Sequence, residues 1–485
     1  MSYPPVPMSS ASLNGVVGVI LLLLALSGCS DYDSQRVSRV ENGLLPLVAT
    51  TDQLGVRSSI TQRMRHYGVP GISVAVFENG RIVWAEGYGI ARDDGDMPVT
   101  EATLFQAASI SKPVTAVGAL RLVQDGILNL DKDVNASLTS WQVPQNQFTQ
   151  DGHVTLRGLL NHSAGITVHG FPGYSVDSTI PPLEDVLNGE VPANTARVEV
   201  DVPIDSEWRY SGGGYTIVQQ LLIDVTRQPF QRFMADSVLR PMGMANSTFE
   251  QPLTESRSAS AASGHQPGLG PVVGSYHIYP EMAAAGLWTT ATDLALFAIG
   301  VHEATVGKPT SILDRTTAGE MLAPQKGNYG LGVEISGDGP SRRFSHSGIN
   351  EGFDSMLVAY SEFGTGAAVM TNSNLSSGLI SEIIGSIAEE YEWPDYPLPG
   401  QREYLPFSDE QLKEYPGTYD LGDGFVVSVV REGEGLLMSV PNQGQTDIYS
   451  RLSGDSQFVT GFPFPPFQFV PDETGYQIQF LPPQE

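Results

Sequence analysis

The chain has 485 residues, of which 41% are hydrophobic and 16% are charged. This composition is typical of a folded globular protein and excludes a predominantly disordered one, and the length allows more than one domain. The 54 acidic residues outnumber the 26 basic residues and give a net charge of −28. Such a surface repels phosphate groups, so nucleic acid is excluded as a partner.

The first thirty residues differ from the rest of the chain. Gly15–Leu26 is an apolar run. It is too short to span a bilayer comfortably, but it suits the core of a signal peptide. The run leads into Leu26-Ser27-Gly28-Cys29, which resembles the lipobox of bacterial lipoproteins. In a lipobox the cysteine is lipidated and becomes the mature N-terminus.

This resemblance implies that Cys29 anchors the protein to a membrane of the bacterial cell envelope. Ser30 directly after the cysteine favours the outer membrane. One feature departs from the pattern, because residues 1–14 contain no lysine or arginine, and an ordinary signal peptide or a stray thiol is the alternative. Cys29 is the only cysteine, so no disulfide or cysteine-ligated metal is expected. We therefore expect a signal peptide over residues 1–29 and a tether over residues 30–48.

The main domain, expected over residues 49–391, begins with a helix and a hairpin. Arg57–His66 predicts the helix, and two apolar strands, Ile72–Phe77 and Ile82–Ala85, flank an Asn79-Gly80 turn. The strands that could pair with this hairpin are predicted only far downstream. The sheet is therefore expected to be built from both ends of the domain.

Ser109 and Lys112 open the next predicted helix, which has apolar residues at helical spacing. Residues i and i+3 share one helix face, so both side chains would point the same way. A serine hydroxyl is a weak nucleophile that needs a base, and a lysine can be that base only where its surroundings lower its pKa. An S-x-x-K tetrapeptide is common on solvated helix faces, so other stretches must support this interpretation.

The middle of the chain contains two further candidate residues. His162 ends a predicted helix over Leu156–Ile166, and a structural role is favoured over a catalytic one. Thr167–Glu207 is rich in proline and glycine and is expected to shape a substrate pocket. Tyr210 precedes three glycines and the apolar helix Thr216–Val225. The glycine turn favours exposure of Tyr210 to a cleft over packing in the core.

Antiparallel strands and a closing helix complete the main domain. The strands are predicted at Tyr329–Ile335, Phe344–Ile349, Asp354–Tyr360 and Gly366–Thr371, and the helix at Leu379–Tyr391.

Three motifs follow one another in this domain: Ser109-Ile110-Ser111-Lys112, Tyr210-Ser211-Gly212 and His346-Ser347-Gly348. Together they resemble the S-x-x-K, Y-x-N and K-T-G elements of serine β-lactamases and penicillin-binding proteins. The closest likeness is to class C β-lactamases and their carboxypeptidase and esterase relatives, and it covers roughly Val69 to Glu390. It implies an α/β (α+β) fold, with an antiparallel sheet flanked by helices and an all-helical subdomain.

The resemblance also implies roles for individual residues. Ser109 would be the acylated nucleophile, and Lys112 and Tyr210 would share the proton transfers. The N–H groups of Ser109 and Ile349 would form the oxyanion hole. No cofactor and no metal is implied. The strand that contacts the substrate would be formed by His346, Ser347, Gly348 and Ile349.

Two positions depart from the family pattern. His346 stands where the family has lysine, and a histidine is a weaker, pH-dependent cation for a substrate carboxylate. Gly212 stands where the family has an asparagine that contacts the substrate amide. We therefore expect a serine hydrolase that acts on an ester or a small amide of a small-molecule or peptide substrate.

Two alternatives remain open from the sequence. One is a weak or inactive relative that serves as a ligand-binding module of the envelope, which the same two departures favour. The other is a cell-wall carboxypeptidase that acts on D-alanyl peptides.

The last segment predicts a separate small β domain. Residues 392–406, rich in proline and aromatic side chains, are expected to form a linker. A domain over residues 407–485 would then resemble the lipocalin-like C-terminal additions of some related hydrolases. Its predicted hairpins are Gly424–Val430 with Leu436–Val440 and Phe467–Val470 with Tyr476–Phe480.

Overall fold

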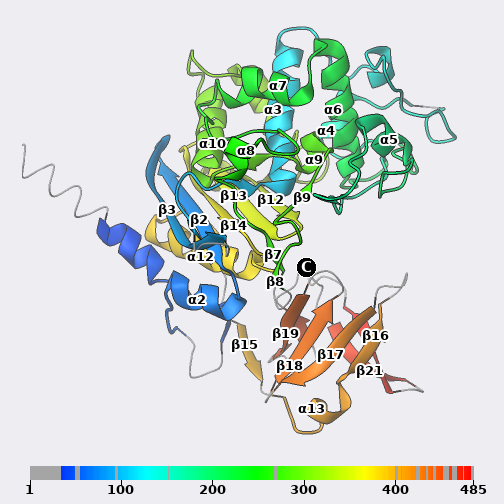
Figure 1. Ribbon diagram of the computed structural model, residues 1–485. Helices are drawn as coiled ribbons and strands as arrows, with labels where there is room; N and C mark the ends of the chain where they lie inside the picture. The colour runs from blue at the N-terminus through cyan, green and yellow to red at the C-terminus, as the bar shows by residue number, and fades with distance from the viewer. Residues whose placement is uncertain are drawn as a thin grey trace, which may run out of the picture.

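The computed structural model shows a large domain of sheet and helices with a smaller β domain below it (Figure 1). None of its helices is long and apolar enough to cross a bilayer within the residues it describes, and the predicted lipidation residue Cys29 lies outside them. The described residues are 34–49, 55–92, 97–150, 152–266, 270–398, 402–405, 407–421, 426–432, 435–440, 444–451, 458–460, 467–472 and 475–481.

A seven-stranded antiparallel sheet forms the centre of the large domain, in the order β11-β12-β13-β14-β2-β3-β4. The N-terminal hairpin pairs through β2 with β14, so the prediction of a sheet built from both ends of the domain is confirmed. The strands are β2 (Gly71–Glu78), β3 (Arg81–Arg92), β4 (Met97–Pro98), β11 (Glu334–Ser336), β12 (Arg343–Asn350), β13 (Phe353–Tyr360) and β14 (Thr365–Thr371).

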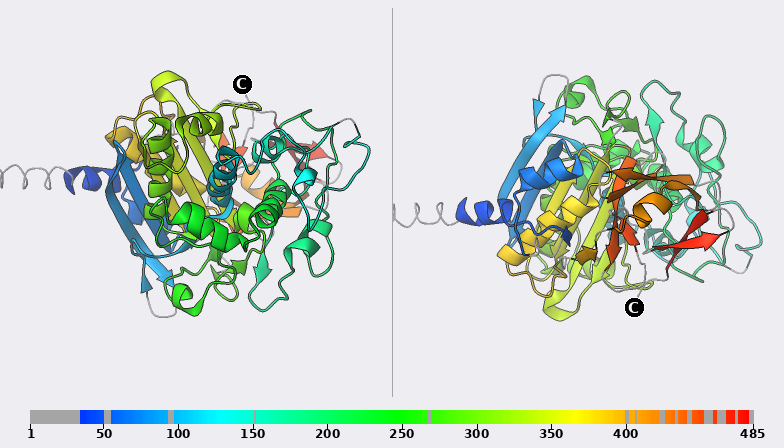
Figure 2. Two further views of the ribbon diagram at one scale, coloured as in Figure 1. Left: turned by 90° about the horizontal axis from the view of Figure 1, so that it is seen from above. Right: turned by 90° about the horizontal axis from the view of Figure 1, so that it is seen from below.

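Helices cover both faces of this sheet. On one face α2 (Ile60–Tyr67) and α12 (Ser377–Glu390) pack against apolar side chains of β2 and β14. On the other face α10 (Ala291–Thr305) leads into the helical subdomain. Because β2 is covered on both sides, its residues from Gly71 to Phe77 are all buried, which explains its nearly continuous apolar sequence. Figure 2 shows the two helical layers with the sheet between them.

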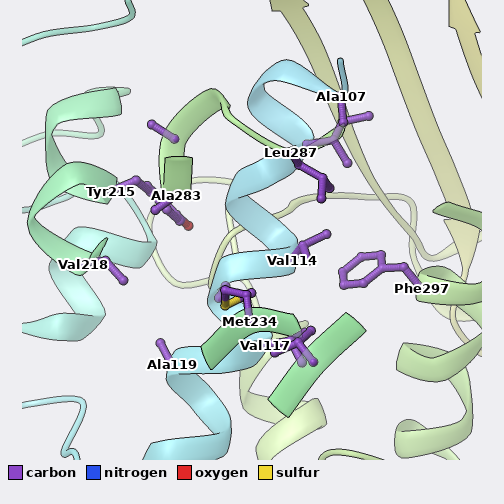
Figure 3. Packing of buried hydrophobic residues seen from close by; sticks show 14 of the residues in the cluster. Ala107, Val114, Val117, Ala119, Tyr215, Val218, Met234, Ala283, Leu287 and Phe297 are labelled. Atoms are coloured by element: carbon purple, nitrogen blue, oxygen red, sulfur yellow. The ribbon is translucent and has the colours of Figure 1, made fainter. Parts of the chain in front are cut away.

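The helical subdomain is built around α3 (Ser111–Gln124), whose apolar side chains point in every direction. A helix that is hydrophobic all round requires burial on all sides. Figure 3 shows Val114 and Val117 of α3 among side chains from α6, α7, α9 and α10. The other helices are α4 (Leu156–Leu160), α5 (Leu183–Asn188), α6 (Gly212–Thr226), α7 (Phe230–Met234), α8 (Glu255–Ser258), α9 (Met282–Ala285) and α11 (Arg315–Met321).

Short elements connect these helices to the sheet. They are the two-residue strands β5 (Phe105–Gln106), β6 (Tyr174–Ser175), β7 (His265–Gln266), β8 (Gly270–Pro271), β9 (His277–Ile278) and β10 (Trp288–Thr289), the 3₁₀ turns η1 (Ala108–Ile110), η2 (Val134–Ala136) and η4 (Gly339–Ser341), and the short π-helix η3 (Ala235–Leu239).

The C-terminal residues form the predicted small β domain around its own apolar core. Strands β16 to β22 follow one another in the sheet, and its first and last strands, β16 and β22, are in contact. The likeness to lipocalin-like domains stays a prediction. The elements are β15 (Arg402–Leu405), α13 (Gln411–Glu414), β16 (Gly417–Asp420), β17 (Val426–Glu432), β18 (Gly435–Val440), β19 (Gly444–Arg451), β20 (Phe458–Thr460), β21 (Phe467–Asp472) and β22 (Gly475–Phe480).

Two predicted connectors need correction. Residues 34–41, expected within the tether, are helical, and Val40 and Leu44 are buried in the core beneath α12. The proposed linker 392–406 contains β15, which pairs with β19 and with the N-terminal strand β1 (Val48–Ala49). Both segments carry apolar or extended residues that find partners only in the folded chain, so neither is a free connector in its described part.

Candidate active site

Ser109 lies in the short turn η1, two residues before α3 begins at Ser111. The sequence predicted Ser109 in the first turn of the helix, whereas it lies in the short turn just before the helix. The i, i+3 relationship with Lys112 is kept. Lys112 Nζ donates hydrogen bonds to Ser109 Oγ at 3.0 Å and to the carbonyl oxygen of Ala284 at 2.9 Å. Only 2% of Lys112 is exposed. The amine is therefore held against the hydroxyl in a site with little water.

The backbone at the serine has an unusual conformation. Ala108 has a φ of 49°, in the left-handed region that residues with a Cβ rarely adopt. Its carbonyl oxygen accepts a hydrogen bond from Ser111 Oγ, and the same Oγ accepts one from the N–H of Leu287. These bonds fix the sharp turn that presents Ser109 at the start of α3.

Tyr210 faces the same amine from the segment that leads into α6. Lys112 Nζ lies 4.9 Å from the centre of the Tyr210 ring. Ser211 directly after the tyrosine is the N-cap of α6, since its Oγ accepts from the N–H of Gly214 and donates to the carbonyl of Thr167. The cap fixes the place where the chain enters the helix and so places the preceding tyrosine beside Lys112.

The third predicted motif borders the serine from the sheet. A Cβ built on Gly348 would lie 2.2 Å from the carbonyl oxygen of Ala107 and 3.0 Å from the nitrogen of Ser109. Only glycine allows strand β12 to approach the serine turn this closely. Ser347 and Ile349 alternate with buried neighbours, and Ile349 is 56% exposed.

His346 is neutral in the folded protein. Its Nδ1 lies 2.6 Å from the carbonyl oxygen of Ser347, which can only accept, so Nδ1 carries the proton. Its Nε2 then accepts from the hydroxyl of Tyr329, 3.0 Å away. Burial, together with the nearby charge of Lys112, lowers the pKa of His346 to about 3. The sequence argument expected a weaker, pH-dependent cation than lysine at this position, and desolvation weakens the cation further.

Tyr329 was missed as a site residue. It falls in a segment predicted as strand Tyr329–Ile335, whereas β11 begins only at Glu334. The preceding residues form a loop that brings Tyr329 to His346, and the Tyr329 ring lies 4.9 Å from that of His162. No sequence signal separates this tyrosine from a core residue, since its partner is 17 positions away.

His162 has the structural role that the sequence favoured, but it performs that role within the site. It is 2% exposed, and burial is the main cause that lowers its pKa well below the usual value. Its Nδ1 accepts from the N–H of Ser211 at 3.2 Å, and its ring lies 4.4 Å from that of Tyr210. Its Nε2 has no hydrogen-bond partner among the described residues.

Gly212, the second departure from the motif, is explained by packing. A Cβ at this position would lie 2.8 Å from the ring of Phe171 and 3.2 Å from the carbonyl oxygen of His169. Phe171 belongs to the irregular segment that was expected to shape the pocket. Its aromatic ring stands in the space into which a larger side chain at position 212 would project.

The structure therefore brings Ser109, Lys112, Tyr210 and the His346–Ile349 strand together from η1, α3, the start of α6 and β12. In the part of the chain that is described, no group of three or more His, Cys, Asp or Glu side chains is arranged to hold a metal. The predicted lipidation residue Cys29 lies outside that part.

Comparison with known proteins agrees with this fold. Residues 56–383 match the family model described as Beta-lactamase. The chain is 25% identical to Protein flp of Staphylococcus aureus (strain N315) over 63% of its own length and 60% of that protein's. It is 22% identical to Penicillin-binding protein 4* of Bacillus subtilis (strain 168), over 78% of this chain and 85% of that one.

Two solved structures show the same fold at low identity. One is the octameric penicillin-binding protein homologue from Pyrococcus abyssi, with a TM-score of 0.59, 21% identity, and coverage of 87% of this chain and 97% of that one. The other is the D-amino acid amidase from Ochrobactrum anthropi SV3, with a TM-score of 0.57, 22% identity, and coverage of 69% and 96%.

Proposed function

Because the chain belongs to the beta-lactamase family, we propose that it is a serine hydrolase that forms an acyl-enzyme on Ser109 with an ester or a small amide. The observation that carries this proposal is the 3.0 Å hydrogen bond between Lys112 Nζ and Ser109 Oγ. A nucleophile with its base already in hydrogen-bond contact is the arrangement that nucleophilic catalysis needs.

In the acylation step, Ser109 Oγ attacks the carbonyl carbon while its proton passes to Lys112 in its unprotonated form. The C–O or C–N bond to the leaving group then breaks, and the proton reaches that group through Lys112 and Tyr210. The negative charge on the carbonyl oxygen would be stabilised by the N–H groups of Ser109 and Ile349. The closeness of Gly348 to the Ser109 nitrogen supports this placement.

In the deacylation step, water attacks the acyl carbon and gives its proton to the same pair of residues. The bond from the carbon to Ser109 Oγ breaks, and the proton returns to the serine. No metal or redox step is needed for this sequence, because each proton released is taken up again within one cycle.

The proposal is tested by intact-mass detection of a covalent adduct. We expect a fluorophosphonate probe and a chromogenic acetate ester to acylate or label the wild type once, at Ser109. Ser109→Ala should be unlabelled and inert, while Ser381→Ala, which changes an exposed serine on α12, should behave as wild type. The panel should include β-lactams, D-amino acid amides and D-alanyl peptides. An unlabelled wild type would overturn the enzyme assignment.

The second candidate is an inactive relative that binds a ligand in the same cavity. The neutral His346 and the missing side chain at Gly212 support it, because both remove contacts that would hold a substrate for turnover. In that case ligands would raise the melting temperature of the wild type and of Ser109→Ala equally, without any adduct.

We further propose that Cys29 is lipidated and anchors the protein to the cell envelope, most simply at the outer membrane. The support is the apolar run that ends in Leu-Ser-Gly-Cys. Labelled palmitate should enter the wild type but not Cys29→Ala. The protein should leave the membrane fraction in that variant, and retention there would contradict the anchor.

A further inference from the structure

We propose that Phe171, seated against Gly212, restricts the site to esters whose acyl group is apolar, uncharged and free of an amide next to the scissile carbonyl. This inference rests on the proposed hydrolase function and names its substrate class.

The first step is that an aromatic ring fills the space that the carboxamide of the family's asparagine would occupy at position 212. A side chain at position 212 would point at the Phe171 ring, since its Cβ would come within 2.8 Å of one ring carbon. The ring therefore occupies the volume next to the Tyr210-Ser211 turn. A substrate group that reached this wall would meet carbon atoms and not a carboxamide. An unpaired amide of the substrate would lose its hydrogen bonds to water there without replacement.

The second step is that the ring is held firmly. The segment before Phe171 is tied to the start of α6, where the carbonyls of Val168 and His169 accept from the N–H groups of Gly213 and Gly212, both at 3.0 Å. After it, the carbonyl of Pro172 accepts from His277 Nδ1 at 2.9 Å. These bonds fix the backbone on both sides of Phe171, and its half-buried ring packs against the core, so the wall is preformed.

The third step concerns charge. Burial, and after it the charge of Lys112, lowers the pKa values of the site histidines His162, His169 and His346, so that these rings are poor cations. That lysine is already bonded to Ser109 and Ala284. A substrate carboxylate would find no second cation in this cluster, and the net charge of −28 would disfavour its approach.

The fourth step is the character of the remaining wall. Trp208 is 45% exposed, and its ring lies 6.2 Å from that of Tyr210 and 5.6 Å from that of Tyr329. Ile349 is exposed on strand β12. These side chains offer contact area to an apolar acyl group on both sides of the serine turn.

The test uses three p-nitrophenyl esters of equal acyl length: the pentanoate, the N-acetylglycinate and the mono-ester of glutaric acid. We expect wild-type kcat/KM for the pentanoate to exceed that for each of the other two by at least about tenfold, the size expected when a buried polar group lacks a partner. Phe171→Ala combined with Gly212→Asn should shift the ratio of pentanoate to N-acetylglycinate toward the amide by about tenfold or more.

Three single variants complete the design. Gly212→Asn alone should lose activity on every ester, because the asparagine meets the ring. Phe171→Leu should keep the wild-type preference. Phe171→Ala alone should lower kcat/KM for the pentanoate relative to p-nitrophenyl acetate, and it decides the question if the double variant does not fold.

The two proposals fail in different ways. The inference about Phe171 is wrong, and the hydrolase assignment stands, if the wild type forms the Ser109 adduct but shows no preference among the three esters. The same conclusion follows if Phe171→Ala leaves the ratio of kcat/KM for the pentanoate to that for the acetate unchanged. If no ester or probe acylates the wild type, the hydrolase assignment itself is overturned.

Discussion

The hydroxyl of Tyr329 donates a hydrogen bond to Nε2 of His346, with 3.0 Å between the two atoms. Both residues are buried, and the tyrosine hydroxyl is the donor to Nε2, which is the only acceptor atom of the neutral ring. Replacing the phenol therefore leaves a buried acceptor without a donor.

We predict that Tyr329→Phe lowers the free energy of unfolding by about 1–3 kcal/mol, the cost of leaving a buried polar atom unpaired. Urea unfolding of wild type and variant measures this difference. Tyr174→Phe, which removes a hydroxyl that accepts from the N–H of Asn194 outside the cluster, provides a comparison. A Tyr329→Phe chain as stable as wild type would show that the bond contributes nothing.

The neutral state of His346 gives a pH dependence with a defined sign. Its pKa is about 3 in the folded chain and near 6.5 when unfolded. Between these values the unfolded chain binds more protons, so the contribution of this ring is fully present above pH 6.5 and is lost as the pH falls toward 3. The stability gap between wild type and His346→Gln should therefore shrink as the pH drops, while His153→Gln, at an exposed position, should show no such trend. A gap that widens on acidification would contradict the neutral ring.

The contribution of Glu281 to stability should change with pH in the opposite direction to that of His346, and at higher pH. It is fully buried, neither carboxylate oxygen has a hydrogen-bond partner among the described residues, and burial raises its pKa to about 8. The folded chain keeps this proton between pH 4.5 and 8 while the unfolded chain loses it, so stability falls over that range. As the pH rises between those values, the free energy of unfolding of Glu281→Gln should increase relative to that of wild type by a few kcal/mol, at about 1.4 kcal/mol per pKa unit. Denaturant unfolding at several pH values checks this, with the exposed Glu362→Gln as control. A difference that does not change with pH would refute it.

Ala108, the residue before the proposed nucleophile, has a left-handed backbone conformation and should therefore tolerate replacement by glycine. Ala108 has a φ of 49° and is buried, so Ala108→Gly removes backbone strain but also a packed methyl group. We expect the glycine variant to stay within about 1 kcal/mol of wild type and to keep its activity. Ala108→Val should lose more than about 2 kcal/mol, because a branched side chain is strained at this φ. Equal stability of the two variants would argue against strain at this position.

The role of Lys112 is tested by a change that keeps its charge. A guanidinium is not deprotonated in proteins, so Lys112→Arg should retain a cation but lose the base. We expect kcat/KM on the acetate ester to fall by at least about a hundredfold, the contribution typical of general base catalysis. Because Lys112 is buried, circular dichroism and the melting temperature must show that the variant is folded. A folded variant with near wild-type kcat/KM would exclude Lys112 as the base.

The sequence alone determined the features that depend on neighbours along the chain. The three-residue spacing from Ser109 to Lys112 fixes their common direction, and the Asn79-Gly80 turn fixes the first hairpin, because backbone conformation over a few residues follows local sterics and hydrogen bonding. The order of the three motifs likewise identified the family, whose model matches residues 56–383.

Only the tertiary structure decided what surrounds these residues. The charge of His346 depends on burial and on the nearby Lys112. The space at Gly212 is filled by the ring of Phe171, and Val40 packs against a helix more than 300 residues away. Desolvation and close packing arise between segments that are distant in sequence, and no local pattern records which segments will meet. The sequence thus specified the candidate reacting groups, and the fold specified the polarity and shape of the space around them.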